Sequence, residues 1–239
     1  MSISNAMTPR NLGIASIAAV VVLCAGAAVP AQAASIQGVW KISKPTVEVK
    51  PVSGEVPFTA EGREHYENNL KLRAAKKFDD YDITLSRCSS PGVPRLALTP
   101  MRFKIWEQFG ATSFDYEWNR ANRFVDTSGQ KLEQSLVPNF TGTSSGHWES
   151  NTFVAVTTDL SDRTLIDDIL PHTLDMKVTE RYRLLNPNTL EDRVTINDPE
   201  YYSHPWDFVV TYKRQPDAVF PEDVCLDRLK AGQPVFPKS

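Results

Sequence analysis

The chain has 239 residues, a formal net charge of −3 and 41% hydrophobic residues. A chain of this length can bury one substantial core. The mild negative charge provides no clustered basic surface of the kind that nucleic-acid binding requires. We therefore expect a single folded domain that does not bind nucleic acid.

Residues 1–33 have the three parts of a secretory signal peptide. Arg10 is the only charged side chain in this segment, residues 12–29 are apolar or small, and Ala31 and Ala33 form a small-x-small cleavage site. An uncleaved membrane anchor is the alternative, since the apolar run is close to the minimum span. We expect cleavage, which leaves 206 residues of the 239 in the periplasm or secreted, with no other membrane span.

The cysteine count fits an oxidising compartment. Cys24 leaves with the signal peptide, so only Cys88 and Cys225 remain. A disulfide between them is the simplest interpretation, and two free thiols are the alternative. A crosslink over so long a loop stabilises by about 4–5 kcal/mol in the chain-entropy treatment.

One helix is predicted over residues 60–77, near the start of the mature chain. It has a capping residue, acidic residues in its first turn, basic residues in its last turn and an apolar face at spacing four. These are Thr59 as the cap, Glu61 and Glu64, Lys76 and Lys77, and the face of Tyr66, Leu70 and Ala74.

The remainder of the domain is predicted to be strands. Period-two alternation, which buries one face of a strand and exposes the other, recurs along the chain. The clearest runs cover residues 102–109, 113–118, 152–158, 178–184, 190–196 and 208–213. Short turns between them favour antiparallel pairing in a closed barrel or a sandwich. We therefore predict a mainly β domain over 34–228, with a loose tail at 229–239.

The first strand opens with Gly38-Val39-Trp40. This resembles the Gly-x-Trp opening of lipocalin-like (calycin) barrels, in which a basic residue of the last strand covers the indole. The resemblance implies that Lys213 or Arg214 takes that place, in an antiparallel barrel. A core tryptophan of another β fold is the alternative.

A wider set of motifs resembles a family of uncharacterised exported bacterial proteins. It extends over residues 88–225 and implies no particular reaction. The motifs are Cys88 with Pro91-Gly92-Val93-Pro94-Arg95, Phe114 to Arg123, Gly142 to Glu149, Asp162 to Asp167, Pro171-His172, Glu180-Arg181, Leu190-Glu191-Asp192, Asp198-Pro199, Pro205-Trp206 and Asp223-Val224-Cys225. Ser150-Asn151 departs from the family pattern, which has Gly-Asp there.

Three carboxylates fall on strand faces that are otherwise apolar: Glu107, Glu180 and Asp192. A buried carboxylate must be paired, hydrogen-bonded or protonated. The candidate partners are Arg95, Arg120 and Arg123. The carboxylates therefore line a polar cavity or form structural ion pairs, unless the strand register is shifted and they lie outside.

A catalytic set is one reading of these residues. His172 or Glu180 would remove a proton, Tyr116 would return one, and Arg123 would hold developing negative charge. His204 is a second candidate base. This set predicts a cofactor-independent lyase or isomerase acting on an aromatic, plant-derived phenolic molecule.

The letters Gly142-Thr143-Ser144-Ser145-Gly146 match a hydrolase motif, but the strand–turn–helix context of that motif is not expected here. The histidines have no metal-ligand spacing and no phosphate loop is present, so we expect neither a metal nor a cofactor. The glycines of the motif are expected to bend the sheet.

The leading functional hypothesis is a barrel that binds a small apolar or aromatic molecule in its cavity. The expected ligand contacts are Trp118, Tyr182, Asp192, Phe208 and Glu107, with Tyr116 beside them. The lyase or isomerase is the first alternative. A structural factor of the cell envelope, with an exposed apolar patch instead of a pocket, is the second.

Overall fold

The structure is a computed structural model that describes residues 1–2, 35–133, 135, 137–217 and 219–236. The predicted cleavage site and almost all of the predicted signal peptide lie outside these residues. Within the described ranges, no helix combines the length and hydropathy needed to cross a bilayer.

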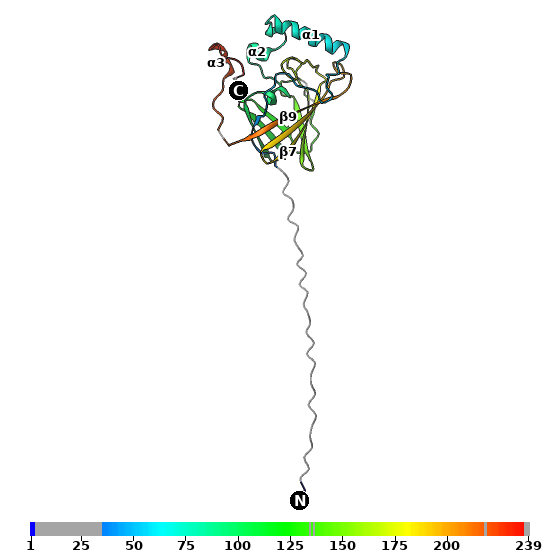
Figure 1. The fold of residues 1–239 in the computed structure, drawn as a ribbon, viewed down its shortest axis with the longest axis vertical. Coiled ribbons are helices and arrows are strands. Elements are labelled where there is room, and N and C mark those ends of the chain that lie inside the picture. The colour runs from blue at the N-terminus through cyan, green and yellow to red at the C-terminus, as the bar shows by residue number, and fades with distance from the viewer. Residues whose placement is uncertain (3–34, 134, 136, 218, 237–239) are drawn as a thin grey trace. The chain divides into compact units, whose positions relative to one another are not determined.

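Nine strands form a closed barrel (Figure 1), in which each strand pairs with the next along the chain and β9 pairs with β1. They are β1 (Gly38–Ile42), β2 (Arg102–Gln108), β3 (Ala111–Tyr116), β4 (Asn122–Asp126), β5 (Thr143–Glu149), β6 (Thr152–Thr158), β7 (Lys177–Asn186), β8 (Thr189–Asn197) and β9 (Trp206–Gln215). The prediction of a mainly β barrel is confirmed.

The prediction of purely antiparallel pairing is wrong at one joint. β4 and β5 are parallel and share the single register pair Asp126↔Ser145. Residues 127–142 connect these two strands, and a connection of that length can return the chain to the starting end of β4. The other eight joints are antiparallel.

The alternation read from the sequence places one face of each strand in the barrel lumen. Phe103 is opposite Tyr116, and Tyr182 is opposite Asp192, and all four are buried. At two places the expected strand continues too far. Phe109 lies in the turn after β2 and is exposed, and Trp118 lies beyond the end of β3.

The helices are α1 (Ala60–Ala74), α2 (Ile83–Arg87) and α3 (Cys225–Lys230), with 3₁₀ turns η1 (Phe78–Asp80), η2 (Arg95–Leu98) and η3 (Trp118–Arg120). In Figure 1, α1 and α2 lie at one end of the barrel. We call this the capped end, because the segments between β1 and β2, between β6 and β7, and between β8 and β9 all leave and re-enter the sheet there.

The helix expected over 60–77 is α1, but its buried face differs from the expectation. Thr59 caps it by accepting a hydrogen bond from the Gly62 amide at 3.0 Å. Gly62 and Asn69 are its buried residues, whereas Leu70 is exposed. Gly62 packs on the backbone of Tyr201, so α1 contacts the connection between β8 and β9 through its smallest residue.

Trp40 and Arg214 meet at the other end of the barrel. The Arg214 guanidinium lies 4.2 Å from the centre of the indole ring, and the two residues are register partners on β1 and β9. Arg214 also donates to the carbonyls of Gln37 and Pro187, both at 2.7 Å. Of the two basic residues expected over the indole, Arg214 occupies the place.

The disulfide between Cys88 and Cys225 is confirmed, with 5.8 Å between the two Cα atoms. The C-terminal segment expected to be loose is anchored on the domain at Val235 and Phe236, although residues 230–234 are exposed. Val235 is buried, and its carbonyl accepts hydrogen bonds from Trp118 at 3.3 Å and Arg228 at 2.6 Å. The disulfide holds α3 close by, so these contacts form at little entropic cost.

Candidate functional site

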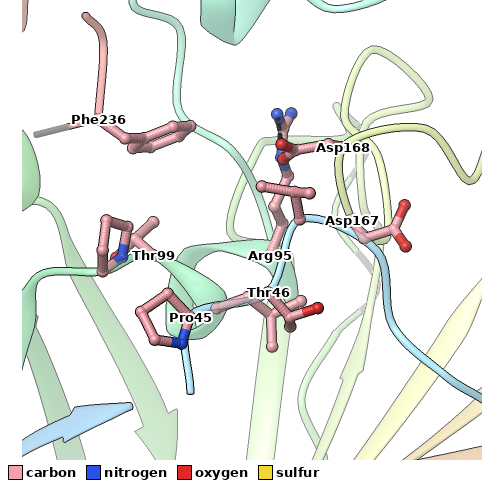
Figure 2. Close-up of a pocket in the computed structure, with 10 residues that line it drawn as sticks. Pro45, Thr46, Arg95, Thr99, Asp167, Asp168 and Phe236 are labelled. Atoms are coloured by element: carbon pink, nitrogen blue, oxygen red, sulfur yellow. Dashed lines mark hydrogen bonds and ion pairs between the residues drawn. The ribbon is translucent and has the colours of Figure 1, made fainter. Parts of the chain in front are cut away.

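A pocket of about 300 Å³ opens at the capped end of the barrel (Figure 2). Its wall is mostly apolar, and four separate segments build it. The lining residues are Pro45, Thr46 and Val47 after β1, Arg95, Leu98, Thr99 and Pro100 before β2, Asp167 and Asp168 before β7, and Phe236. We call this the mouth pocket.

Arg95 is the cation of the mouth pocket and is almost fully buried. It donates two parallel hydrogen bonds to Asp82 at 2.8 and 2.9 Å, and its Nε donates to Asp168 at 3.0 Å. Figure 2 shows its guanidinium beside Asp168, with the Phe236 ring on the other side of the pocket. One guanidinium therefore faces two carboxylates. Burial raises the pKa of Asp168, and the nearby Arg95 charge opposes that rise.

Asp167 binds backbone amides instead, and its side chain points away from Arg95 (Figure 2). Its carboxylate accepts hydrogen bonds from the backbone amides of Val49, Ile169 and Leu170, at 2.8–2.9 Å. Burial raises its pKa to about 6, although the three amides favour the charged form. Asp167 therefore fixes the loop that forms one wall of the mouth pocket.

A second polar site lies inside the barrel, and we call it the lumen cluster. It consists of Tyr116 (β3), Arg123 (β4), Ser144 (β5), Thr157 (β6), Glu180 and Tyr182 (β7), Asp192 (β8) and Tyr212 (β9), all of them buried.

Arg123 and Glu180 form the ion pair of the lumen cluster. Their side chains are 1% and 0% exposed, and Arg123 Nη2 lies 2.5 Å from Glu180 Oε2. Arg123 also donates to Ser144 at 3.2 Å and Thr157 at 2.7 Å, while Tyr182 donates to Glu180 at 2.8 Å. Both oxygens of Glu180 are therefore engaged, which confirms Arg123 as its partner among the arginines predicted.

Asp192 has no well-formed hydrogen bond of this kind. The Arg181 backbone amide and the Tyr182 hydroxyl lie near its carboxylate, but neither of its oxygens has a partner at normal hydrogen-bond geometry among the described residues, and the same holds for Tyr212 Oη and Arg123 Nη1. The nearby Tyr182 hydroxyl has one proton, which it donates to Glu180. Burial first, and the Glu180 charge second, raise the pKa of Asp192 well above its ordinary value.

His172, the predicted general base, lies in the connection between β6 and β7 at the capped end, and it is not part of the lumen cluster. Its Nε2 is 2.8 Å from Thr164 Oγ1, and its Nδ1 is 2.8 Å from the Thr173 carbonyl. Burial lowers its pKa, so the neutral ring is favoured. The structure therefore does not bring His172 together with Glu180, as the catalytic reading required.

The other predicted site residues divide between the lumen and elsewhere. Tyr116, Tyr182 and Phe208 face the lumen as expected. Trp118 packs instead on Phe236, with ring centres 5.9 Å apart, because η3 turns the chain out of the sheet. Glu107 is half-buried at the opposite end from the cap, where it accepts a long hydrogen bond from Ser35.

The sequence reading missed several residues of both sites. Ser144 and Thr157 are small polar residues whose burial beside Arg123 gives no periodic signal. Ser144 lies within β5, so the hydrolase letters around it lack the turn and helix of a nucleophile elbow. Asp82 lies between the helix predicted at 60–77 and the strand run at 102–109, and only its position before a short helix could have marked it as a cap.

No protein-family model matches this chain, and no curated protein matches it. Among solved structures, it is similar to a secretary abundant heat soluble (SAHS) protein from Ramazzottius varieornatus. The two are 12% identical, with a TM-score of 0.29, over 75% of this chain and 95% of that one. A likeness at this level supports no inference about function. Membership of the exported bacterial family stays a prediction.

No group of three or more histidine, cysteine or acidic side chains is placed to hold a metal ion within the described part of the chain. The two candidate sites are an apolar pocket with a buried ion pair and an enclosed cluster of polar groups. Both are built from organic side chains that recognise small molecules by shape, hydrogen bonds and charge.

Proposed function

We propose that this protein is a small-molecule-binding barrel whose ligand, a small apolar or aromatic molecule, occupies the mouth pocket. The observation that carries the proposal is the apolar pocket of about 300 Å³ with one buried, charge-paired arginine in its wall. Ligand pockets combine an apolar lining with a few convergent polar groups in this way.

The wall of the mouth pocket favours an aromatic or aliphatic ligand with a single hydrogen-bond donor. Val47, Leu98 and the Phe236 ring supply apolar surface. Asp168 is the partly exposed member of the Arg95 network, with 23% of its side chain accessible, so its carboxylate is available to accept from a ligand. A ligand carboxylate would add to an existing excess of negative charge there, which disfavours acidic molecules.

The barrel itself supports a lipocalin-like interpretation of this binding. The Arg214 guanidinium over Trp40 supplies the contact that the Gly-x-Trp resemblance implies, and it lies at the end opposite the mouth pocket. We favour ligand binding over a lyase or isomerase activity, because the side-chain nitrogens of His172 and the carboxylate oxygens of Glu180 are already bonded to other groups of the protein. A poised acid–base pair needs free polar atoms near a substrate.

We also propose that the protein works in the periplasm or outside the cell. The signal-like residues 1–33 and the Cys88–Cys225 disulfide support this, since disulfides persist in oxidising compartments. Intact mass spectrometry of the periplasmic fraction, without reductant, tests it. The expected species begins near Ala34 and is oxidised, whereas a full-length or reduced species would contradict the proposal.

Titration with the neutral fluorophore N-phenyl-1-naphthylamine tests the mouth pocket. We expect its emission to rise and shift to the blue on binding. Val47→Asp places a charge in the wall and should weaken binding at least tenfold, a change of about 1.4 kcal/mol. Val47 is 60% exposed, so the fold should tolerate the change.

The matched control is Val52→Asp. Val52 is 58% exposed and, like Val47, has its backbone in a hydrogen bond, but it does not line the mouth pocket. This variant should bind as the wild type does. Equal loss in both variants, or no loss in Val47→Asp, would refute the mouth pocket as the binding site.

A further inference from the structure

A groove on the outer wall of the barrel is separate from both the mouth pocket and the lumen cluster. It has a volume of about 310 Å³ and lies between β2, β3, the turn η3 and residues 219–220 of the segment that leads to α3. A volume of this order suits a small organic ligand. We call this site the outer groove.

Aromatic side chains form the apolar walls of the outer groove. Trp106 lies on the outward face of β2, where it follows the buried Ile105 and is 42% exposed. Phe220 supplies a second ring, and the Arg102 guanidinium lies 5.5 Å from the centre of that ring. Arg102 is itself held by two hydrogen bonds to Glu117, at 2.5 and 3.1 Å, so the Phe220 wall is anchored on the sheet. The groove thus offers two rings to a flat aromatic ligand.

The charged side chains of the outer groove are mainly basic. Lys104 and Arg120 line it, and neither takes part in a salt bridge among the described residues. The Lys104 ammonium lies 5.1 Å from the centre of the indole ring. Asp115 is the one acid in the described lining, and its carboxylate already accepts hydrogen bonds from Ser113 and Asn122. Two cations and one carboxylate give the groove a net charge of +1, which favours an anionic ligand.

The backbone is strained at the point where η3 presents Arg120. Asn119 and Arg120 both have left-handed backbone angles, with φ of 48° and 51°, which residues other than glycine rarely adopt. The segment after β9 holds this conformation. The Asn119 amide donates to the Asp223 carboxylate, and Asn119 Oδ1 accepts from the Cys225 amide at 3.3 Å. Strained residues of this kind cluster at binding sites, where the surrounding structure fixes them.

We infer that the outer groove is a second ligand site, which takes an aromatic carboxylate. The ring of the ligand lies against Trp106 and Phe220, and its carboxylate accepts hydrogen bonds from Arg120, with Lys104 as the second cation. A guanidinium matches the two oxygens of a carboxylate, and hydrogen bonds between charged groups are stronger than those between neutral groups. This preference is opposite to that of the mouth pocket, where two carboxylates face one cation.

Calorimetric titration with 2-naphthoate tests this site, with 2-naphthamide as the neutral molecule of similar shape. We expect the dissociation constant of the naphthoate to be at least about tenfold lower, because only the naphthoate forms charged hydrogen bonds. Added salt should weaken the naphthoate and leave the amide unchanged, because ions screen exposed charges. The indole N–H signal of Trp106 in nitrogen-15 NMR, assigned by its loss in Trp106→Phe, should shift as the groove fills.

Arg120→Gln and Lys104→Gln each remove one cation of the outer groove. Each should raise the dissociation constant of the naphthoate at least about fivefold, and both side chains are accessible to solvent, so the fold should tolerate the changes. The matched control is Lys177→Gln, which removes an exposed lysine of β7 that does not line the groove and should bind normally. Val47→Asp should also keep naphthoate binding, so failure at the mouth pocket and failure here are distinguishable.

No detectable binding of 2-naphthoate, or equal affinity for 2-naphthamide, would overturn the inference. So would unchanged binding in either Arg120→Gln or Lys104→Gln. An equal loss in Lys177→Gln would indicate a general attraction by surface charge and would also refute the site. A Trp106 signal that stays in place in saturating naphthoate would put the ligand elsewhere on the protein.

Discussion

The ion pair in the lumen cluster predicts an asymmetry between two substitutions. Arg123→Met removes the one cation and leaves Glu180 and Asp192 as two buried acids. Removing one partner of a buried pair costs about 3–5 kcal/mol of unfolding free energy. Glu180→Gln leaves Arg123 charged, but Asp192 can then ionise and become its counter-ion. We expect this second loss to be about half as large, roughly 1.5–2.5 kcal/mol.

Urea unfolding at pH 7 measures both losses, since a midpoint shift at constant slope reports stability. The double variant Glu180→Gln, Asp192→Asn removes both acids. Its loss of unfolding free energy should again be about 3–5 kcal/mol, well beyond the sum of the losses in the two single variants. Such non-additivity is the signature of a shared partner. Equal losses for Arg123→Met and Glu180→Gln, or an additive double variant, would refute the idea that Asp192 can replace Glu180.

Three further outcomes follow from the structure. Replacing Cys88 and Cys225 by alanine opens a crosslink between residues 137 apart, so the unfolding free energy should fall by up to about 5 kcal/mol in urea titrations. Gly62→Ala should destabilise by about 1–3 kcal/mol despite its helical position, because the added Cβ would lie 2.1 Å from the Tyr201 carbonyl oxygen; a thermal shift upward would contradict this. Folding raises the pKa of Asp192, so its protonated form stabilises the fold at low pH and this contribution is lost as pH rises. Asp192→Asn should therefore gain on the wild type above about pH 4, by up to about 1.4 kcal/mol per unit, and parallel pH curves would exclude this.

The fold could be predicted well where residues repeat with a strand period. Alternation placed Tyr182 and Asp192 on the inner face of their strands, and both are buried there. It also singled out Glu180, for which Arg123 was one of three candidate partners. Periodicity reports which face of a strand is buried, so it carries most of the information about a barrel lumen.

The capped end could not be predicted in the same way. Asp82 and Arg95 lie in the connection between β1 and β2, and Asp168 lies in the connection between β6 and β7. Residues in such connections have no repeating pattern that reports burial. The mouth pocket depends on how these loops meet, and this is fixed by contacts between segments far apart in sequence. The parallel joint of β4 and β5 was missed because neither strand is among the alternating runs of the sequence. The long connection between them also leaves strand direction open.

That joint has a consequence for how the barrel moves. At the other joints backbone hydrogen bonds run along both strands, but β4 and β5 share one register pair, so little backbone bonding closes the wall there. The Arg123 side chain on β4 donates a hydrogen bond to Ser144 on β5. Side chains thus hold this joint together, whereas backbone hydrogen bonds do so at the other joints. Local opening is cheapest where backbone bonds are few. Local opening between β4 and β5 therefore gives access to the lumen, and Arg123, which also neutralises Glu180, holds the two strands together. Among the strands of the barrel, amide exchange should be fastest along β4 and β5.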